Sequence, residues 1–264
     1  MGRIDEAFSR LKRDGKKGFI PFITAGDPDL DTTVELLVEI ANSGATIIEL
    51  GVPFSDPMAD GPVIQRASER ALKHGFGLKE IFAVTVKARA KIETPLVLFS
   101  YFNPLLQYGI DKLARDARAA GIDGMLVSDL IPEESEKFAA SLKSNDLARI
   151  FLVAPTSTDA RLEMISDHAS GFVYAVSRAG VTGARDSLSR EAELLVARVR
   201  RFSHLPVAVG FGISSAQQVK QTLAYADAAV VGSAIVAQIE KLSASENLVR
   251  ETGQFVRSLI PGGN

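Results

Sequence analysis

The chain has 264 residues, a formal net charge of −2 and no cysteine, with 46% hydrophobic and 23% charged residues. This composition is typical of a globular protein, and it excludes disulfides, thiolate zinc sites and cysteine nucleophiles. The balanced charge offers no basic field for nucleic acid or an anionic membrane. With neither a signal-peptide pattern nor the roughly 20 apolar residues of a membrane span, we expect a soluble cytoplasmic protein, or alternatively a plastid form whose transit peptide has been removed.

The first predicted element is a helix over residues 3–13. After it, short apolar runs alternate with segments in which apolar residues recur with the helical period of 3.6. The runs predict eight strands, over residues 18–24, 46–50, 95–100, 124–128, 149–154, 171–176, 205–210 and 228–232. Glycines suited to a left-handed helix cap precede three of these strands, at Gly44, Gly121 and Gly171.

Eight strand–helix units without a linker predict the α/β class and a single (β/α)8 TIM barrel over residues 1–264. The extra helix at the amino terminus is expected to cover the bottom of the barrel. A doubly wound open sheet is the alternative. The first strand-to-helix turn, TAGDPD (24–29), lacks the GxGxxG pattern typical of many such sheets, and the number of units favours closure.

A barrel of this kind has its site where the strands end, and two long loops follow strands there, at 51–62 and 177–189. Glu49 is the penultimate residue of the second strand. Strand alternation places it on the same face as Ile47 and opposite Ile48 and Leu50, so it is expected to point into the barrel mouth. Partial burial would raise its pKa toward neutrality, which suits acid–base chemistry. The alternative is an ordinary glutamate that is salt-bridged or faces outward.

Asp60 lies in a loop stiffened by Pro53 and Pro57 and followed by Pro62. Proline restricts the backbone and lowers the entropy lost when a loop folds over a site. Spacing alone leaves two readings open for Asp60, a carboxylate of the site or a cap of the following helix.

The turns after the seventh and eighth strands, GFGIS (210–214) and GSAIV (232–236), are rich in glycine. Glycines there let a ligand approach the backbone, and a helix start offers free N–H groups to a phosphate. The predicted phosphate-binding residues are Gly183, Gly212, Gly232 and Ser233; the alternative is that these glycines only form tight turns. His74, His168 and His204 are read as surface or structural residues, and no cluster has metal-ligand spacing, so no metal is expected.

The segment ELGVPFSDPMADGP (49–62) resembles the signature of the tryptophan synthase alpha chain family, and PFITAGDP (21–28) and SRAGVTGAR (177–185) agree with it. The resemblance implies reversible retro-aldol cleavage of indole-3-glycerol phosphate to indole and glyceraldehyde 3-phosphate in tryptophan biosynthesis. It implies that Glu49 moves protons and that Asp60 accepts the indole N–H. It also implies a lid containing Arg178 and Thr182.

An indole ring needs a flat apolar slot, for which seven residues at the strand ends are candidates, with packing in the barrel core as the alternative: Phe22, Phe99, Tyr101, Leu126, Ser128, Val153 and Tyr174. The resemblance further implies a separate beta chain, in an α2β2 heterotetramer, that docks on loop 53–62 and carries the pyridoxal phosphate, so no cofactor is expected in this chain. Two other functions stay open, a stand-alone indole-3-glycerol-phosphate lyase and a catalytically silent, phosphate-binding regulatory subunit.

Overall fold

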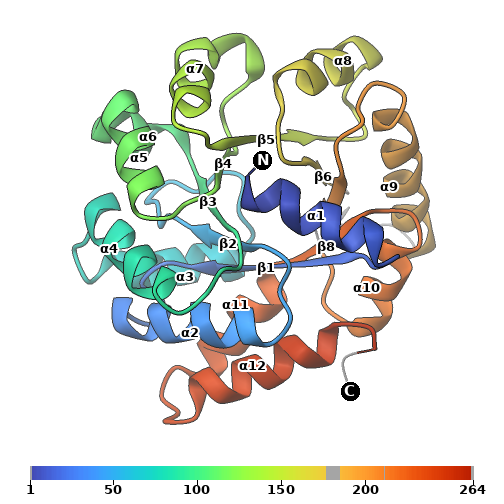
Figure 1. Ribbon diagram of the computed structural model, residues 1–264. Coiled ribbons are helices and arrows are strands. Elements are labelled where there is room, and N and C mark those ends of the chain that lie inside the picture. The colour runs from blue at the N-terminus through green and yellow to red at the C-terminus, as the bar shows by residue number, and fades with distance from the viewer. Residues whose placement is uncertain (1, 177–184, 211, 263–264) are drawn as a thin grey trace.

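The computed structural model describes residues 2–176, 185–210 and 212–262, with residues 185–189 described by their backbone alone. Eight parallel strands pair in sequence order, and β1 pairs with β8, so the sheet closes into a barrel (Figure 1). This closure confirms the predicted (β/α)8 barrel and excludes the open sheet. The strands are β1 Gly18–Thr24, β2 Ile48–Gly51, β3 Leu96–Ser100, β4 Gly124–Val127, β5 Ala148–Val153, β6 Val173–Val176, β7 Val207–Gly210 and β8 Ala228–Val231.

The helices surround the barrel and cover the outward-facing side chains of the strands. Gly44, Gly121 and Gly171 all have positive φ angles, of 101°, 87° and 81°. Gly44 and Gly121 directly follow the helix C-caps Ser43 and Ala120, as predicted. The helix before Gly171 ends at His168 with Ala169 as its C-cap, so the prediction that Gly171 caps it is wrong. In the part of the chain that the structure describes, no helix is long and apolar enough to cross a membrane. The outer helices are α2 Leu30–Asn42, α3 Pro62–Leu72, α4 Leu78–Arg89, α5 Phe102–Tyr108, α6 Ile110–Ala119, η1 Pro132–Glu134, α7 Glu136–Ser144, α8 Asp159–His168, α9 Arg185–Val199, α10 Ala216–Leu223, α11 Ser233–Leu242 and α12 Leu248–Leu259.

Helix α1, Arg3–Arg13, lies across the end of the barrel where the strands begin (Figure 1). Its buried residues Ile4 and Phe8 pack with the residues that fill the barrel interior. The rings of Phe8 and Phe172 lie 5.8 Å apart, centroid to centroid. The helix therefore closes the amino-terminal end, as predicted, and leaves the opposite end open for a site.

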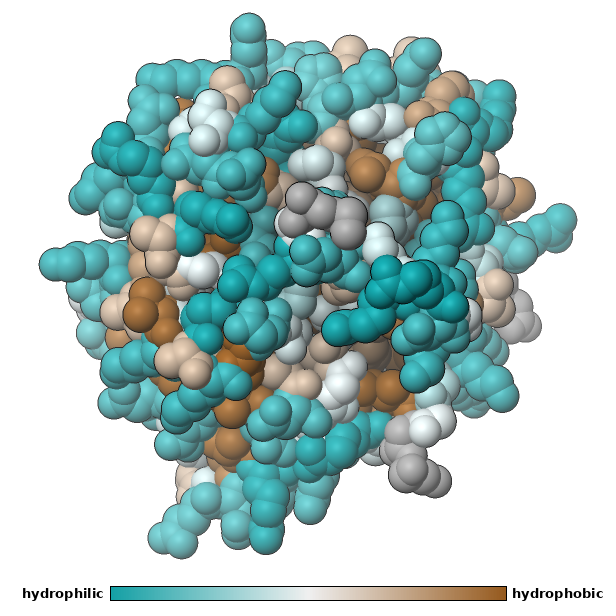
Figure 2. All heavy atoms as spheres, in the orientation of Figure 1, coloured by the Kyte–Doolittle hydropathy of each residue, from teal (hydrophilic) through white to brown (hydrophobic). Residues whose placement is uncertain are grey.

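Two buried or half-buried carboxylates at this amino-terminal end are fully paired. Asp123 is 5% exposed, bonds to Arg3 and Arg89 at 3.1 and 3.0 Å, and accepts the backbone N–H of Leu96. Asp227 bonds to Lys17 and Arg200 and accepts the backbone N–H of Val207. Figure 2 shows that hydrophilic residues dominate this face. These carboxylates join strands and helices, and each of them is paired with two cationic side chains.

Candidate active site

Glu49 points into the barrel from β2. Its neighbour Ile47 belongs to the interior cluster, whereas Ile48 and Leu50 pack outward against helices, so the predicted alternation is confirmed. Glu49 is 1% exposed, and among the described residues its Oε1 atom has no hydrogen-bond partner. Burial raises the pKa of Glu49 from its ordinary value to about 8. A carboxyl group in this position holds a proton at neutral pH and can release it.

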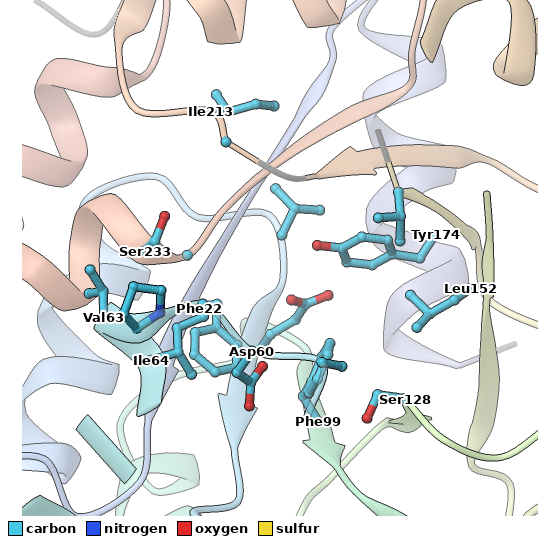
Figure 3. Close-up of a pocket in the computed structure, with 18 residues that line it drawn as sticks. Phe22, Asp60, Val63, Ile64, Phe99, Ser128, Leu152, Tyr174, Ile213 and Ser233 are labelled. Carbon is cyan, nitrogen blue, oxygen red and sulfur yellow. The ribbon is translucent and has the colours of Figure 1, made fainter. Parts of the chain in front are cut away.

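Glu49 and Asp60 both line a cavity of about 340 Å3 at the carboxyl ends of the strands. Figure 3 shows Tyr174 and Leu152 on one side of this cavity and Phe22 and Ile64 on the other. The polar lining is sparse, with Ser128, Ser233 and glycines beside the two carboxylates. A cavity with these walls fits a flat apolar group, and the few polar groups are available to orient it. The apolar lining comprises Phe22, Val63, Ile64, Phe99, Leu152, Tyr174, Val176, Ile213 and Val230.

Asp60 is not the cap of the following helix. The N-cap of α3 is Gly61 and its first residue is Pro62, so the reading of Asp60 as a cap is wrong. Burial raises the pKa of Asp60, and a hydrogen bond from Tyr101 acts in the opposite direction. The Tyr101 hydroxyl accepts the Ala59 N–H at 2.9 Å, so it holds the loop and the carboxylate together. Asp60 thus reaches the cavity as a partly buried carboxyl group fixed by one tyrosine.

Two glycines that the sequence analysis did not single out make room for the aromatic walls. A Cβ atom at Gly51 would collide with the Phe22 ring, and one at Gly210 would collide with the Tyr174 hydroxyl. Both glycines end strands, at β2 and β7. The sequence shows that each glycine ends a strand. It does not show that an aromatic residue of the neighbouring strand lies against that glycine, because this depends on which strands pair.

The predicted phosphate residues lie at one side of the same cavity. Gly212, Gly232 and Ser233 all line it, and Gly212 has a φ angle of 70°, which favours glycine. Gly232 is the N-cap and Ser233 the first residue of α11, so the helix start is directed at the cavity. Free N–H groups at such a start bind anions. Gly183 lies outside the described residues, as do Arg178 and Thr182 of the predicted lid.

Four of the seven predicted slot residues line the cavity, namely Phe22, Phe99, Ser128 and Tyr174. The rings of Phe22 and Phe99 meet edge to face, with centroids 5.6 Å apart and planes at 82°. Tyr174 shares the inner face of its strand with Phe172, as predicted from alternation.

The other three predicted residues do not line it. Val153 packs outward with Leu162 and Val196, because strand alternation turns Leu152 inward instead. Leu126 is fully buried in the barrel interior. Tyr101 lies behind Asp60, in a small gap that it shares with Phe22 and Ser68. Residues of α3 and of the strand-7 turn, Val63, Ile64 and Ile213, replace them in the lining, and the sequence analysis missed these because their role depends on how the loops fold back.

The histidines lie away from the cavity. His74 Nε2 lies 2.7 Å from the Pro28 carbonyl oxygen, and His168 Nδ1 lies 2.8 Å from that of Met164. Over residues 2–176, 185–210 and 212–262, no three histidine or acidic side chains gather closely enough to hold a metal ion. The polar side chains that line the cavity are Glu49, Asp60, Ser128, Tyr174 and Ser233, beside the backbone of Gly212 and Gly232.

The fold and the site together define a class of protein. A closed (β/α)8 barrel with its cavity at the carboxyl ends of the strands has the architecture of the barrel enzymes. The buried carboxyl group and the open helix start add acid–base chemistry and anion binding to that architecture.

Comparisons with known proteins give the family. The family model described as "Tryptophan synthase alpha chain" matches residues 8–260. The tryptophan synthase alpha chain of Solibacter usitatus is 48% identical over 262 residues, which cover 99% of this chain and 98% of that one. That of Geobacter sulfurreducens is 48% identical over 259 residues, 98% of each chain.

Solved structures agree with these relatives. The tryptophan synthase subunit alpha of Legionella pneumophila matches with a TM-score of 0.91 and 38% identity, covering 98% of this chain and 97% of that one. A chain from the tryptophan synthase α2β2 complex of Pyrococcus furiosus matches with a TM-score of 0.85 and 39% identity, covering 92% and 97%. This chain belongs to the tryptophan synthase alpha chain family, whose members are the alpha subunits of that enzyme.

Proposed function

We propose that this chain cleaves indole-3-glycerol phosphate reversibly into indole and glyceraldehyde 3-phosphate by a retro-aldol reaction. The observation that carries the proposal is Glu49, a buried carboxyl group with a raised pKa that faces an apolar cavity. Family membership supplies the substrate, and the cavity supplies one acid–base group and one carboxylate beside apolar walls.

Glu49 moves the proton in this proposal. Protonated Glu49 donates its proton to C3 of the indole ring, and the ring nitrogen becomes positively charged. The carboxylate then takes the proton of the hydroxyl on the adjacent carbon of the glycerol chain. As this hydroxyl becomes the aldehyde, the bond from its carbon to C3 breaks, and its electron pair returns to the ring and neutralises the nitrogen. Glu49 ends the cycle protonated, so one group serves as acid and then as base.

Asp60 stabilises the charge that develops on the ring nitrogen. As a carboxylate it accepts the indole N–H, and this bond strengthens as the nitrogen becomes positive. The hydrogen bond from Tyr101 favours the ionised form of Asp60, whereas burial opposes it. Burial, with the charge of Asp60, raises the pKa of Tyr101 to about 12, so the phenol stays a donor. Tyr101 is therefore proposed as a positioning residue.

Substrate binding away from the breaking bond fixes the geometry of the reaction. We assign the phosphate to Gly212, Gly232 and Ser233, with Gly183 as a further contact. The indole ring is assigned to the slot between Phe22, Phe99 and Tyr174. Holding both ends of the substrate positions C3 against Glu49, and such positioning lowers the entropic part of the barrier. Arg178 and Thr182 are proposed to belong to a lid over this site.

The proposal includes a partner. The Pyrococcus furiosus relative comes from an α2β2 complex, and we propose that this chain likewise assembles with a beta chain, which carries the pyridoxal phosphate. Loop 53–62 is the proposed docking surface. Met58 in this loop is 92% exposed, and the ring of Phe54 lies 5.1 Å from that of Tyr101. Docking on the loop would thus act on the residue that holds Asp60.

The direct test is to incubate the purified chain with indole-3-glycerol phosphate, with and without added beta chain, and to measure indole and glyceraldehyde 3-phosphate. We expect both products in equal amounts, with faster release when the beta chain is present. Absence of both products in the two arms would refute the proposed reaction. Equal rates in the two arms would instead indicate a stand-alone lyase.

A further inference from the structure

A second cavity lies at the opposite end of the barrel from Glu49. It measures about 440 Å3 and lies between the start of α1, the end of α6, the loop after α7 and the first residues of β5. It belongs to the amino-terminal end, the face that Figure 2 shows. None of the residues proposed for catalysis lines it. Its charged lining comprises Asp5, Arg118, Asp123, Lys143, Asp146 and Arg149.

Arg149 occupies a position on β5 that strand alternation makes apolar. Phe151 and Val153, on the same outward face, pack against helices, whereas Ile150 and Leu152 face the barrel interior. Arg149 also borders a small gap with Met125, Val127 and Phe138. In the strand pairing it lies opposite Met125, an apolar residue of similar length. Packing alone would therefore be satisfied by methionine, so the charge at this position needs another explanation.

The guanidinium of Arg149 has no protein partner in the described ranges, and its Nε atom is buried without a hydrogen bond. Burial lowers the pKa of Arg149 from its ordinary value. Arg89, at the same end of the barrel, also has an Nε atom that is buried without a hydrogen bond, so the contrast with Arg149 lies in the terminal nitrogens. Those of Arg89 bond to Asp123 and to the carbonyls of Ile92, Thr94 and Gly121. A buried donor left unpaired costs free energy, and a ligand with acceptor oxygens would recover it.

The charges around the cavity are unbalanced. Lys143 and Arg118 stand exposed at its rim, and within the described part of the chain neither forms an ion pair. Asp123 is already bonded to two arginines, and Asp5 accepts the Gly2 N–H. Asp5 and Asp146 are therefore the carboxylates left against the three cations Arg118, Lys143 and Arg149, which leaves one positive charge in excess. The cavity therefore suits an anion.

We propose that this basal cavity, lined by Arg118, Lys143 and Arg149, binds a small anion that carries a phosphate group. A guanidinium presents its N–H groups in a fork that fits two phosphate oxygens, and the two rim cations add long-range attraction. The phosphate can come from inorganic phosphate or from a phosphate monoester. This site is separate from the phosphate residues at α11 and does not depend on the proposed reaction.

The test is a titration of the whole chain with inorganic phosphate, followed by amide NMR signals. The amides of Ala148, Ser170 and Gly171 report the basal cavity, and those of Gly232 and Ser233 report the active site. Arg149→Met removes the charge while keeping an apolar side chain of similar length. We expect saturable shifts in both groups for the unsubstituted chain. In Arg149→Met we expect the phosphate affinity reported by the basal amides to fall at least about tenfold. The affinity reported by the active-site amides should stay unchanged.

Controls separate the remaining outcomes. Arg149→Lys keeps the charge without the fork and is expected to bind with intermediate affinity. A parallel titration with glycerol phosphate distinguishes a phosphate monoester from inorganic phosphate as the better ligand. Equal basal affinity in Arg149→Met would overturn the proposal, as would basal shifts that chloride reproduces at the same ionic strength. Absence of basal shifts in the unsubstituted chain would overturn it as well, whatever happens at Gly232 and Ser233.

Discussion

Buried carboxyl groups at the two ends of the barrel differ in their hydrogen-bond and ion-pair partners. At the amino-terminal end Asp123, 5% exposed, is bonded to two arginines and a backbone N–H. At the carboxyl end Glu49, 1% exposed, has an oxygen without a partner among the described residues. Burial is nearly the same, so the difference lies in the partners. Paired carboxylates stabilise the fold, whereas an unpaired one keeps a proton that can be transferred.

The same difference separates Asp227 from Glu49 in the direction of their pKa shifts. Burial would raise the pKa of Asp227, but the Val207 N–H, Lys17 and Arg200 together lower it. For Glu49 burial acts alone and raises the pKa to about 8. We therefore expect substitutions at the carboxyl end to lower turnover and substitutions at the amino-terminal end to lower stability.

The largest effect is expected for Glu49→Gln. Glutamine keeps the shape but cannot transfer a proton, so turnover should fall by about 10²–10⁴-fold. Binding of a glycerol phosphate analogue should persist, because the phosphate residues are untouched. Steady-state indole release and analogue binding measure the two quantities. Glu163→Gln, an exposed glutamate on α8, is the matched control. Normal turnover in Glu49→Gln would contradict the assigned role.

The next effect is expected for Asp123→Asn, in stability rather than in turnover. This change leaves the half-buried Arg89 without its carboxylate partner, which is expected to cost about 3 kcal/mol of the free energy of unfolding. Urea denaturation measures it, and the folded protein should keep its turnover. If Asp123→Asn instead kept its stability and lost turnover, Asp123 would act in catalysis rather than in stabilising the fold, which would contradict the prediction.

The third prediction concerns pH. Between the ordinary pKa of 4.5 and the raised value of about 8, Glu49 is protonated in the folded chain and ionised in the unfolded one. The folded state binds more protons, so the contribution of Glu49 to stability falls as pH rises across this window and is constant above it. The free energy of unfolding of the unsubstituted chain, measured relative to Glu49→Gln, should therefore decline from pH 4.5 to 8. A difference independent of pH would show that Glu49 titrates normally.

The smallest effect is expected for Tyr101→Phe. Loss of the hydroxyl removes the hydrogen bond to Asp60 and the acceptor of the Ala59 N–H. The pKa of Asp60 should rise, and turnover should fall on the order of tenfold, as for a hydrogen bond to a charged group. A role in positioning predicts that kcat falls more than KM changes and that the acidic limb of the pH profile moves upward. A change in KM alone would assign Tyr101 to substrate binding instead.

The fold was largely predictable from sequence because its signals are local and repeated. Apolar runs, helical periods and glycine caps located eight strands, and alternation within a single strand placed Glu49 correctly between Ile48 and Leu50. The same rule was misapplied at Val153, where the neighbouring Leu152 faces the cavity. Alternation fixes two faces of a strand, but it does not say which face is the inner one.

Other parts of the site depend on contacts between distant segments. Asp60 could not be separated from a helix cap until Gly61 was seen to cap α3 and Tyr101 was seen to hold the loop. The walls formed by Val63 and Ile64, and the space that Gly210 leaves for Tyr174, follow from how loops and neighbouring strands meet. These contacts join segments that are far apart in the sequence, so no local sequence pattern predicts them.

Glu49 is proposed to donate a proton because it is buried and one of its oxygens has no partner among the described residues. The most direct measurement is a titration of its side-chain carboxyl carbon by ¹³C NMR, with Glu49→Gln to assign the signal. We expect a midpoint of about 8 in the folded chain without substrate. A midpoint near the ordinary 4.5 would contradict it, because Glu49 would then be ionised at neutral pH and no more a proton donor than an exposed glutamate.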